Sequence, residues 1–200
     1  MTANPSETAV APEIPAVGEV AESLAFSVGG RAEVTHGTAK VRVPASRWKE
    51  AISAARDGFG LAFLSWLSAI DWRNDVAVGD QPDEPVEERY EMLCALSNLT
   101  DGTLVVISAD IDHEEPSIES VTDVFAGANW HEREAAEMFG IDFVGHPDLI
   151  NLYLPDGFEG HPLRKSFPLL SREVKPWPGK VDVEDMPENG AGPSTENPQA

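Results

Sequence analysis

The chain has 200 residues, enough for one domain with terminal tails, and a core of about 150 residues buries about two-thirds of its unfolded surface without disulfide or metal staples. Its 35 Asp and Glu residues against 14 Lys and Arg give a net charge of −21, which disfavours binding to nucleic acid or to anionic lipid. The single cysteine, Cys94, excludes an internal disulfide and the set of four thiolates that an iron–sulfur cluster usually requires.

The N-terminal segment, residues 1–24, is rich in Ala, Pro and Glu and has no basic residue, so we predict a disordered acidic tail. It has neither the basic and apolar regions of a secretory signal nor the arginines of a mitochondrial transit peptide. No run of about 20 apolar residues follows. We therefore expect a cytoplasmic chain whose association with a membrane depends on partners.

Residues 38–43 alternate valines with polar side chains and predict a strand that ends at Pro44. The next segment has apolar side chains at the spacing of one helix face, namely Trp48, Ile52, Ala55 and Phe59. Gly58 and Gly60 are placed to end that helix. The apolar run 61–70 is compatible with a strand or with a buried helix, and we favour a strand.

Residues 74–88 are polar and contain prolines, so we predict an exposed loop. Residues 89–98 alternate as a strand with one buried face. Asp101-Gly102 is a strong hairpin-turn signal, and the Val- and Ile-rich run 103–111 predicts a central strand. This order of elements predicts an α+β domain, residues 25–140, with a mostly antiparallel sheet and flanking helices.

Two further helices are predicted before the sequence changes character. The first opens at Pro116 and places three apolar side chains on one face, Ile118, Val121 and Phe125. The second covers 130–139, with Asn129 and Glu132 resembling a capping box at its start. Gly140 is suited to end it.

Residues 141–175 are rich in Pro and Gly, yet they carry many large apolar side chains that a disordered linker would lack. We predict an extended, irregular arm that buries these side chains against its own sheet or against another protein. The arm has balanced charge, whereas the acidic rest of the chain favours solubility or docking onto basic partner surfaces. Residues 176–200 are predicted to be a disordered tail.

Two sequence blocks carry a family resemblance. The run from Asn129 to Ile141 reads Asn-Trp-His-Glu-Arg-Glu-Ala-Ala-Glu-Met-Phe-Gly-Ile, and a second block covers 145–149 and 154–165, ending in Gly-His-Pro-Leu-Arg-Lys. They resemble the two signatures of the C subunit of bacterial NADH–quinone oxidoreductase (respiratory complex I, the 30 kDa subunit family), in the expected order and distance. The Lys-Pro-Trp-Pro-Gly run at 175–179 is similar to actinobacterial members.

The chain departs from the family pattern at three positions. The family usually has Asp where Glu137 stands, a bulky residue near Ala136, and Asp where Ser166 stands. None of these changes removes a metal ligand or a nucleophile. They bear on the detailed contacts with partners.

The resemblance implies a non-redox scaffold protein of the peripheral arm, packed beside the quinone-site D subunit and the B subunit. It implies a peripheral position on the cytoplasmic face of the bacterial plasma membrane. The whole complex oxidises NADH with quinone, coupled to proton translocation, through FMN and iron–sulfur clusters. On this chain the resemblance implies no cofactor and no catalytic residue. The nearest alternative is the equivalent subunit of a membrane-bound hydrogenase or of an oxidoreductase with another electron donor.

We predict that 129–170 forms the main surface between subunits, because it combines apolar density with irregular structure. The residues expected at that partner interface are Trp130, Glu132, Arg133, Glu134, Glu137, Phe139, His146, Asp148, Phe158, His161, Pro162, Leu163, Arg164 and Lys165. Within the helix, Arg133 and Glu137 are spaced for a surface ion pair, which would make their role purely structural. Arg164 and Lys165 are suited equally to a partner's carboxylates or to an internal acid.

A more distant hypothesis is a stand-alone hydrolytic metalloenzyme. His131, His146 and His161 are equally spaced with acids beside them, and three histidines can hold a catalytic zinc ion. Against this, no two of them share one element at the close spacing that metal sites usually show. Two of them also precede a proline, which forces the backbone to be extended.

Overall fold

The computed structural model describes residues 17–76 and 84–168. Its elements in chain order are α1 (Val17–Val28), β1 (Arg31–Thr35), β2 (Thr38–Pro44), the 3-10 helix η1 (Ala45–Arg47), α2 (Trp48–Phe59), β3 (Phe63–Asp71), β4 (Tyr90–Ser97), β5 (Leu104–Ile111), β6 (Ser117–Glu119), α3 (Ala128–Phe139) and β7 (Asp142–Val144). The strands predicted at 38–43, 61–70, 89–98 and 103–111 and the helix predicted from Trp48 to Phe59 are confirmed.

The long strands form one sheet in the order β1-β2-β5-β4-β3. Strands β2 and β5 pair in parallel, with Ala39 opposite Val105 at one end, and the other neighbours pair antiparallel. The predicted α+β class with a mostly antiparallel sheet is therefore confirmed. Strands β6 and β7 form a separate parallel pair, in which Ile118 lies opposite Phe143.

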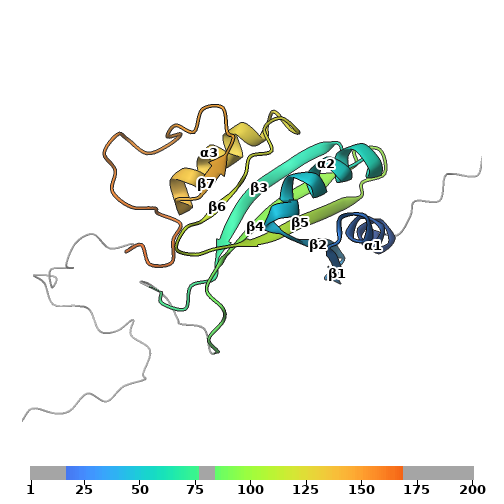
Figure 1. Ribbon diagram of the computed structural model, residues 1–200, viewed down its shortest axis with the longest axis horizontal. Coiled ribbons are helices and arrows are strands. Elements are labelled where there is room, and N and C mark those ends of the chain that lie inside the picture. The colour runs from blue at the N-terminus through green and yellow to red at the C-terminus, as the bar shows by residue number, and fades with distance from the viewer. Residues whose placement is uncertain (1–16, 77–83, 169–200) are drawn as a thin grey trace, which may run out of the picture. The chain divides into compact units, whose positions relative to one another are not determined.

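The core lies between the sheet and the helices α1 and α2, which Figure 1 shows side by side over the strands. Alternate residues of the strands point into this layer, and Leu67, Met92 and Ile107 are almost completely excluded from water. Cys94 belongs to the same layer, as predicted, and burial raises the pKa of its thiol. The cysteine is therefore a small apolar core residue with an unreactive sulfur.

The predicted N-terminal tail is wrong for residues 17–24, which lie in helix α1. The buried side chains of this helix are Ala21, Leu24, Ala25 and Val28, at the spacing of one helix face packed on the sheet. An Ala- and Glu-rich segment suggests disorder by composition, but Ala and Glu also have high helix propensity. Packing of that apolar stripe on the strands decides in favour of the helix.

The helix predicted from Pro116 is also wrong. Its apolar residues are buried as expected, but Ser117–Glu119 forms strand β6, and turns follow. The reason is tertiary pairing: the Asp142 N–H donates to the Pro116 carbonyl over 2.9 Å, and the Ser120 N–H donates to Val144 over 2.9 Å. Backbone partners from β7 replace the intrahelical hydrogen bonds that the spacing alone suggested.

Helix α3 packs beside β3 and begins at Ala128 instead of Trp130. Within the described part of the predicted arm, residues 141–168, β7 is the only regular element. Residues 1–16, 77–83 and 169–200, which include parts of the predicted tails, loop and arm, lie outside the described residues. None of the helices in the described ranges has the length and apolar character that crossing a bilayer needs.

Two glycines at the end of α2 differ in conformation, so we expect their substitution by Ala to change the stability of the fold in opposite directions. Gly60 caps the helix in the left-handed region, with a φ of 68°, whereas Gly58 lies inside the helix with open space where a Cβ would be. We expect Gly58→Ala to stabilise the fold by about 0.5–1 kcal/mol through helix propensity. Gly60→Ala should destabilise it by about 1 kcal/mol, because an L side chain is strained there. Urea unfolding of both variants checks the pair, and equal shifts would contradict it.

Candidate functional site

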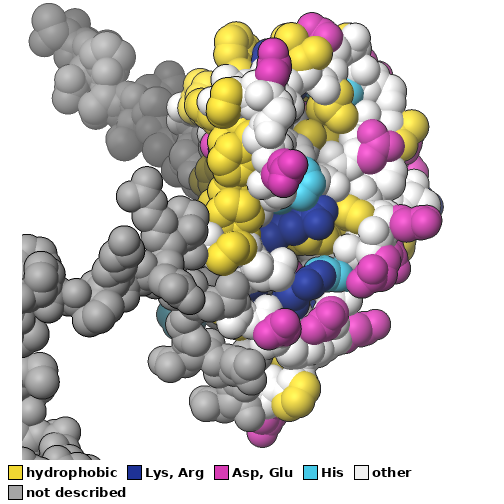
Figure 2. Space-filling model, turned by 90° about the vertical axis from the view of Figure 1, so that its left-hand side faces the viewer, with side chains coloured by type: hydrophobic (Ala, Val, Ile, Leu, Met, Phe, Trp, Pro, Cys, Tyr) yellow, Lys and Arg dark blue, Asp and Glu magenta, His cyan; other side chains and the backbone are white. Residues whose placement is uncertain are grey.

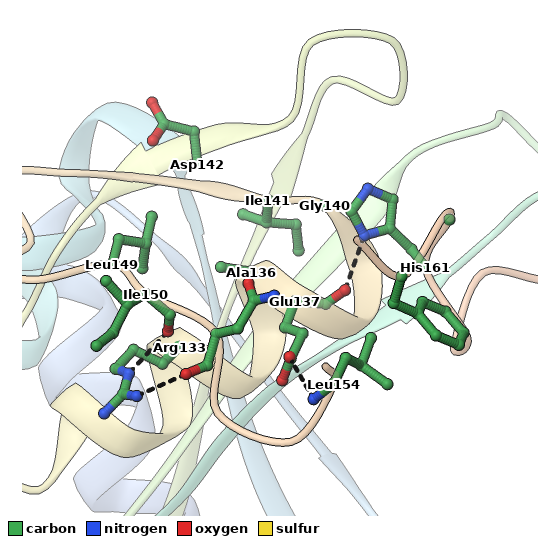
Figure 3. Close-up of a pocket in the computed structure, with 13 residues that line it drawn as sticks. Arg133, Ala136, Glu137, Gly140, Ile141, Asp142, Leu149, Ile150, Leu154 and His161 are labelled. Carbon is green, nitrogen blue, oxygen red and sulfur yellow. Dashed lines mark hydrogen bonds between the residues drawn. The ribbon is translucent and has the colours of Figure 1, made fainter. Parts of the chain in front are cut away.

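Helix α3 presents one face to the core and another to the arm. Ala128, Ala135 and Phe139 are buried against the sheet together with Glu132. Arg133 and Glu137 lie on the other side, where the irregular chain after β7 passes over the helix. Figure 3 shows this arrangement, with the arm running alongside α3 and bonded to it.

The Glu137 carboxylate binds three consecutive backbone N–H groups of the arm. Leu152 and Tyr153 donate to Oε2 over 3.2 and 2.9 Å, and Leu154 donates to Oε1 over 2.7 Å. The residue is only 7% exposed. Burial raises the pKa of Glu137, but the three N–H donors and the nearby Arg133 outweigh it and hold the pKa below its ordinary value. The carboxylate is therefore ionised and clamps the arm.

Arg133 binds the same stretch of chain through its carbonyl groups. Its Nε and Nη2 atoms each donate over 2.9 Å, to the carbonyls of Ile150 and Asn151. Its guanidinium also lies 5.4 Å from the centre of the Trp130 ring. The predicted surface ion pair with Glu137 is replaced by these contacts, so both side chains hold the arm.

The arm in turn caps the C-terminus of α3, whose last carbonyls have no partner within the helix. His161 Nδ1 lies 2.7 Å from the Glu137 carbonyl, the Leu163 N–H donates to Met138 over 3.1 Å, and Arg164 Nε donates to Phe139 over 2.6 Å. A cation next to this negative end of the helix dipole is favourable. Gly140 makes the close approach possible, since a Cβ there would collide with Arg164 and His161.

Glu132 has a different role from the predicted capping box. It is 0% exposed, and its carboxylate accepts the Ser120 hydroxyl over 2.6 Å and the Val121 N–H over 2.7 Å. Burial is the main cause that raises the pKa of Glu132 above its ordinary value. The buried His146 lies 4.0 Å away and accepts the Asp148 N–H at Nδ1. Glu132 thus joins α3 to the segment after β6.

The residues predicted at the interface divide by exposure. Those whose side chains are buried in the free chain are Glu132, Glu137, Phe139 and His146. Those partly or fully exposed are Trp130, Arg133, Glu134, Asp148, Phe158, His161, Pro162, Leu163, Arg164 and Lys165. The buried residues pack below the surface and hold its backbone in place. The exposed residues are available for contact with a partner protein.

Several exposed apolar residues of this region were not among the predicted site residues. They are Val144, Leu149, Ile150 and Tyr153, and Tyr153 is 62% exposed. The apolar content of the arm was a signal for them, but it does not distinguish outward from inward side chains. A cavity of about 330 Å³ lies between α3 and the arm, lined by Arg133, Glu137, Ile150 and His161 among others (Figure 3).

The metalloenzyme hypothesis finds no support in the positions of the three histidines. The ring nitrogens of His146 lie against the Asn129 carbonyl and the Asp148 N–H. His161 Nδ1 lies against the Glu137 carbonyl. Within the described ranges, which include all three histidines, no group of three His, Cys, Asp or Glu residues is arranged to hold a metal ion.

Comparison with known proteins gives consistent matches. The model of the family described as "Respiratory-chain NADH dehydrogenase, 30 Kd subunit" matches residues 41–173. A protein of Phenylobacterium zucineum named as the C subunit of NADH-quinone oxidoreductase is 34% identical over 159 residues, 78% of this chain and 69% of that one. A protein of the same name from Citrifermentans bemidjiense is 31% identical over 145 residues, 72% of this chain and 83% of the relative.

Coverage of the relatives varies. A Roseiflexus protein of the same name is 43% identical, but the match spans 44% of this chain and 51% of the relative, about half its length. A solved trypsin-resistant fragment of Nqo5 aligns with a TM-score of 0.52 and 28% identity over 66% of this chain and 97% of the fragment. An archaeal membrane-bound sulfane sulfur reductase chain aligns with a TM-score of 0.59 over 76% of this chain and 85% of that one, at 20% identity, which shows a shared fold.

The Glu137 clamp predicts a specific loss. We expect Glu137→Gln to lower the free energy of unfolding by about 2 kcal/mol, because a charged acceptor of three N–H groups becomes a neutral amide with only one acceptor atom. Protease cleavage within 149–158 should become faster at the same time. Glu134→Gln on the same helix is the control and should change stability by less than about 0.5 kcal/mol. Equal effects of the two variants would contradict the clamp.

Glu132 and Glu137 are predicted to titrate on opposite sides of the ordinary Glu pKa of 4.5. Because its pKa is lowered in the folded chain, Glu137 stabilises the fold at any pH above its pKa in the unfolded chain. This stabilisation is lost as the pH falls through the pKa of Glu137 in the folded chain. A raised pKa has the opposite sign, so the fold gains stability as the pH falls through the folded pKa of Glu132. Carboxyl ¹³C NMR titration checks both, and two pKa values on the same side of 4.5 would refute the assignment.

Proposed function

This chain belongs to the family of the 30 kDa subunit of respiratory-chain NADH dehydrogenase, and from that premise we propose that it is a structural component of the peripheral arm of an NADH–quinone oxidoreductase. In this proposal it holds neighbouring subunits in place, chiefly the quinone-site D subunit and the B subunit. Other chains carry FMN and the iron–sulfur clusters and bind quinone, and the assembled complex couples electron transfer to proton translocation. Partners hold the chain at the cytoplasmic face of the plasma membrane.

The observation that carries the proposal is the exposed apolar surface of α3 and the arm. We define the α3–arm face by its exposed large apolar side chains, Trp130, Val144, Leu149, Ile150, Tyr153, Phe158 and Leu163. Figure 2, which views this end of the domain, shows hydrophobic side chains gathered along one side. Many exposed aromatic and aliphatic side chains within residues 130–163, on a chain with a net charge of −21, are typical of a protein interface.

A role without redox chemistry on this chain agrees with its side chains. The sequence has one cysteine, and burial raises the pKa of its thiol, so it is a poor ligand and a poor nucleophile. Two charged residues of α3, Arg133 and Glu137, fix the arm through hydrogen bonds to its backbone. These features favour a scaffold whose partners hold the cofactors.

Purification of the tagged full-length chain from gently solubilised membranes tests the proposal. Mass spectrometry should find a full set of NADH–quinone oxidoreductase subunits, including one that binds NADH. A complex with a nickel-containing large subunit and no NADH-binding subunit would assign the chain to the hydrogenase alternative instead. Recovery of the chain alone would overturn the scaffold role.

The α3–arm face predicts a binding defect without a folding defect. Tyr153→Ala removes an exposed aromatic ring but keeps the backbone N–H that Glu137 binds. We expect about tenfold less co-purification of partner subunits, in keeping with the loss of an interface aromatic, and a change in unfolding free energy below about 0.5 kcal/mol. Leu99→Ala, at a residue 75% exposed in the turn between β4 and β5, is the control. Undiminished co-purification of the Tyr153 variant would argue against this face.

A further inference from the structure

Three cations lie together at the end of the sheet where β3 ends. Arg73 follows this strand, and Lys165 is joined to the same place by hydrogen bonds from its backbone N–H to Asp71 Oδ2 over 2.9 Å and from Nζ to the Arg73 carbonyl over 3.3 Å. Arg164 precedes Lys165. All three are partly exposed. We name Arg73, Arg164 and Lys165 the basic strip. In Figure 2, Lys and Arg side chains lie in the middle of this end of the domain, with hydrophobic side chains to their left and acidic ones above, below and to their right.

The polar contacts of the basic strip differ from those of the cations on the sheet. Arg42 and Arg89 both bind the Asp110 carboxylate, over 2.6 and 3.0 Å. In the basic strip, Arg164 Nε donates to a carbonyl, that of Phe139, and Lys165 Nζ also donates to a carbonyl. The Arg73 guanidinium lies 3.0 to 3.2 Å from both ring nitrogens of His113. Carbonyls and a ring orient these side chains, and among the described residues none of the three cations forms an ion pair with a carboxylate.

The Asp71 carboxylate next to them is bound by their backbone groups and not by their side chains. It is only 4% exposed, and it accepts the backbone N–H groups of Arg73 and Lys165, over 3.0 and 2.9 Å. Its Oδ1 also lies 3.7 Å from His113 Nε2, and the other ring nitrogen of His113 lies 3.4 Å from the Glu114 carboxylate. Among residues 17–76 and 84–168, no Asp or Glu oxygen lies within 4.0 Å of a side-chain nitrogen of the basic strip.

Stacked rings hold the basic strip in place. Tyr90 stacks on His113 with ring centres 5.0 Å apart, and the Arg164 guanidinium lies 5.9 Å from the Tyr90 ring. Arg73 lies against His113, so each member of this aromatic pair has a guanidinium beside it. The buried Tyr90 hydroxyl has no hydrogen-bond partner among the described residues. The site is therefore ordered before any ligand binds, which lowers the entropy cost of binding.

We propose that the basic strip binds one or two carboxylates of a partner protein segment, a proposal that rests on the scaffold function above. Guanidinium groups bind carboxylates through paired, charge-assisted hydrogen bonds. The exposed Leu163, next to Arg164 in sequence, adds an apolar contact, so the segment is an acidic one with apolar neighbours. An extended polyanion such as a membrane surface or nucleic acid is disfavoured, because the chain has a net charge of −21.

Charge reversal in the assembled complex tests the site. Lys165→Glu and Arg73→Glu should each reduce retention of the tagged full-length chain in the complex by about tenfold or more. Arg31→Glu is the matched control, an exposed cation on β1 at the opposite edge of the sheet, and should leave retention unchanged. Urea unfolding verifies that all three variants fold. Unchanged retention of the two basic-strip variants, with the wild type retained, would overturn the inference but not the proposed function.

A photo-crosslinking residue in place of Leu163 identifies what occupies the site. We expect a crosslink to a peptide of another subunit that contains Asp or Glu, and changing that acid to Lys should restore retention of Lys165→Glu. A crosslink to phospholipid, to a second copy, or to this chain's own acidic segments would refute the proposed partner. If the wild-type chain co-purifies with no other protein of the complex, the proposed function fails first, and the two failures are thereby distinguished.

Discussion

The Glu137 carboxylate accepts three backbone N–H groups from a stretch of chain that has no hydrogen-bond ladder of its own. Backbone groups removed from water need partners, and an arm without regular structure must find them outside itself. The arm also supplies partners to the helix, because His161, Leu163 and Arg164 bind the carbonyls at the end of α3. Helix and arm therefore complete each other's hydrogen bonds, and each stabilises the other.

This mutual capping explains how an irregular segment can present a defined surface. The polar groups of the arm face α3, and its apolar side chains, such as Ile150 and Tyr153, face outward. The ordering entropy of the arm is already lost when the chain folds, so a partner meets a prepared surface. The same contacts fix Arg164 and Lys165 where β3 ends, which places the basic strip beside the α3–arm face.

Local patterns were sufficient to predict the elements whose residues contact the core at a regular spacing. Helix α2 and the strands β2 to β5 follow from such patterns. Helix α1 was missed because its composition is also that of a disordered tail. Ile118 was assigned to a helix because its spacing does not reveal the pairing with β7. The family motif marked Glu137 as part of the site, but its bonds to residues 15 to 17 positions later depend on the path of the arm, which no local pattern encodes.

Amide hydrogen exchange at Leu152, Tyr153 and Leu154 in the free full-length chain tests the central claim most directly. If Glu137 orders the arm in the free chain, these three amides exchange slowly before any partner is present, because each N–H is bonded to a buried carboxylate. Exchange at the rate of an unstructured peptide in the free chain, with protection only in the assembled complex, would contradict the account. It would mean that a partner, and not Glu137, orders the arm.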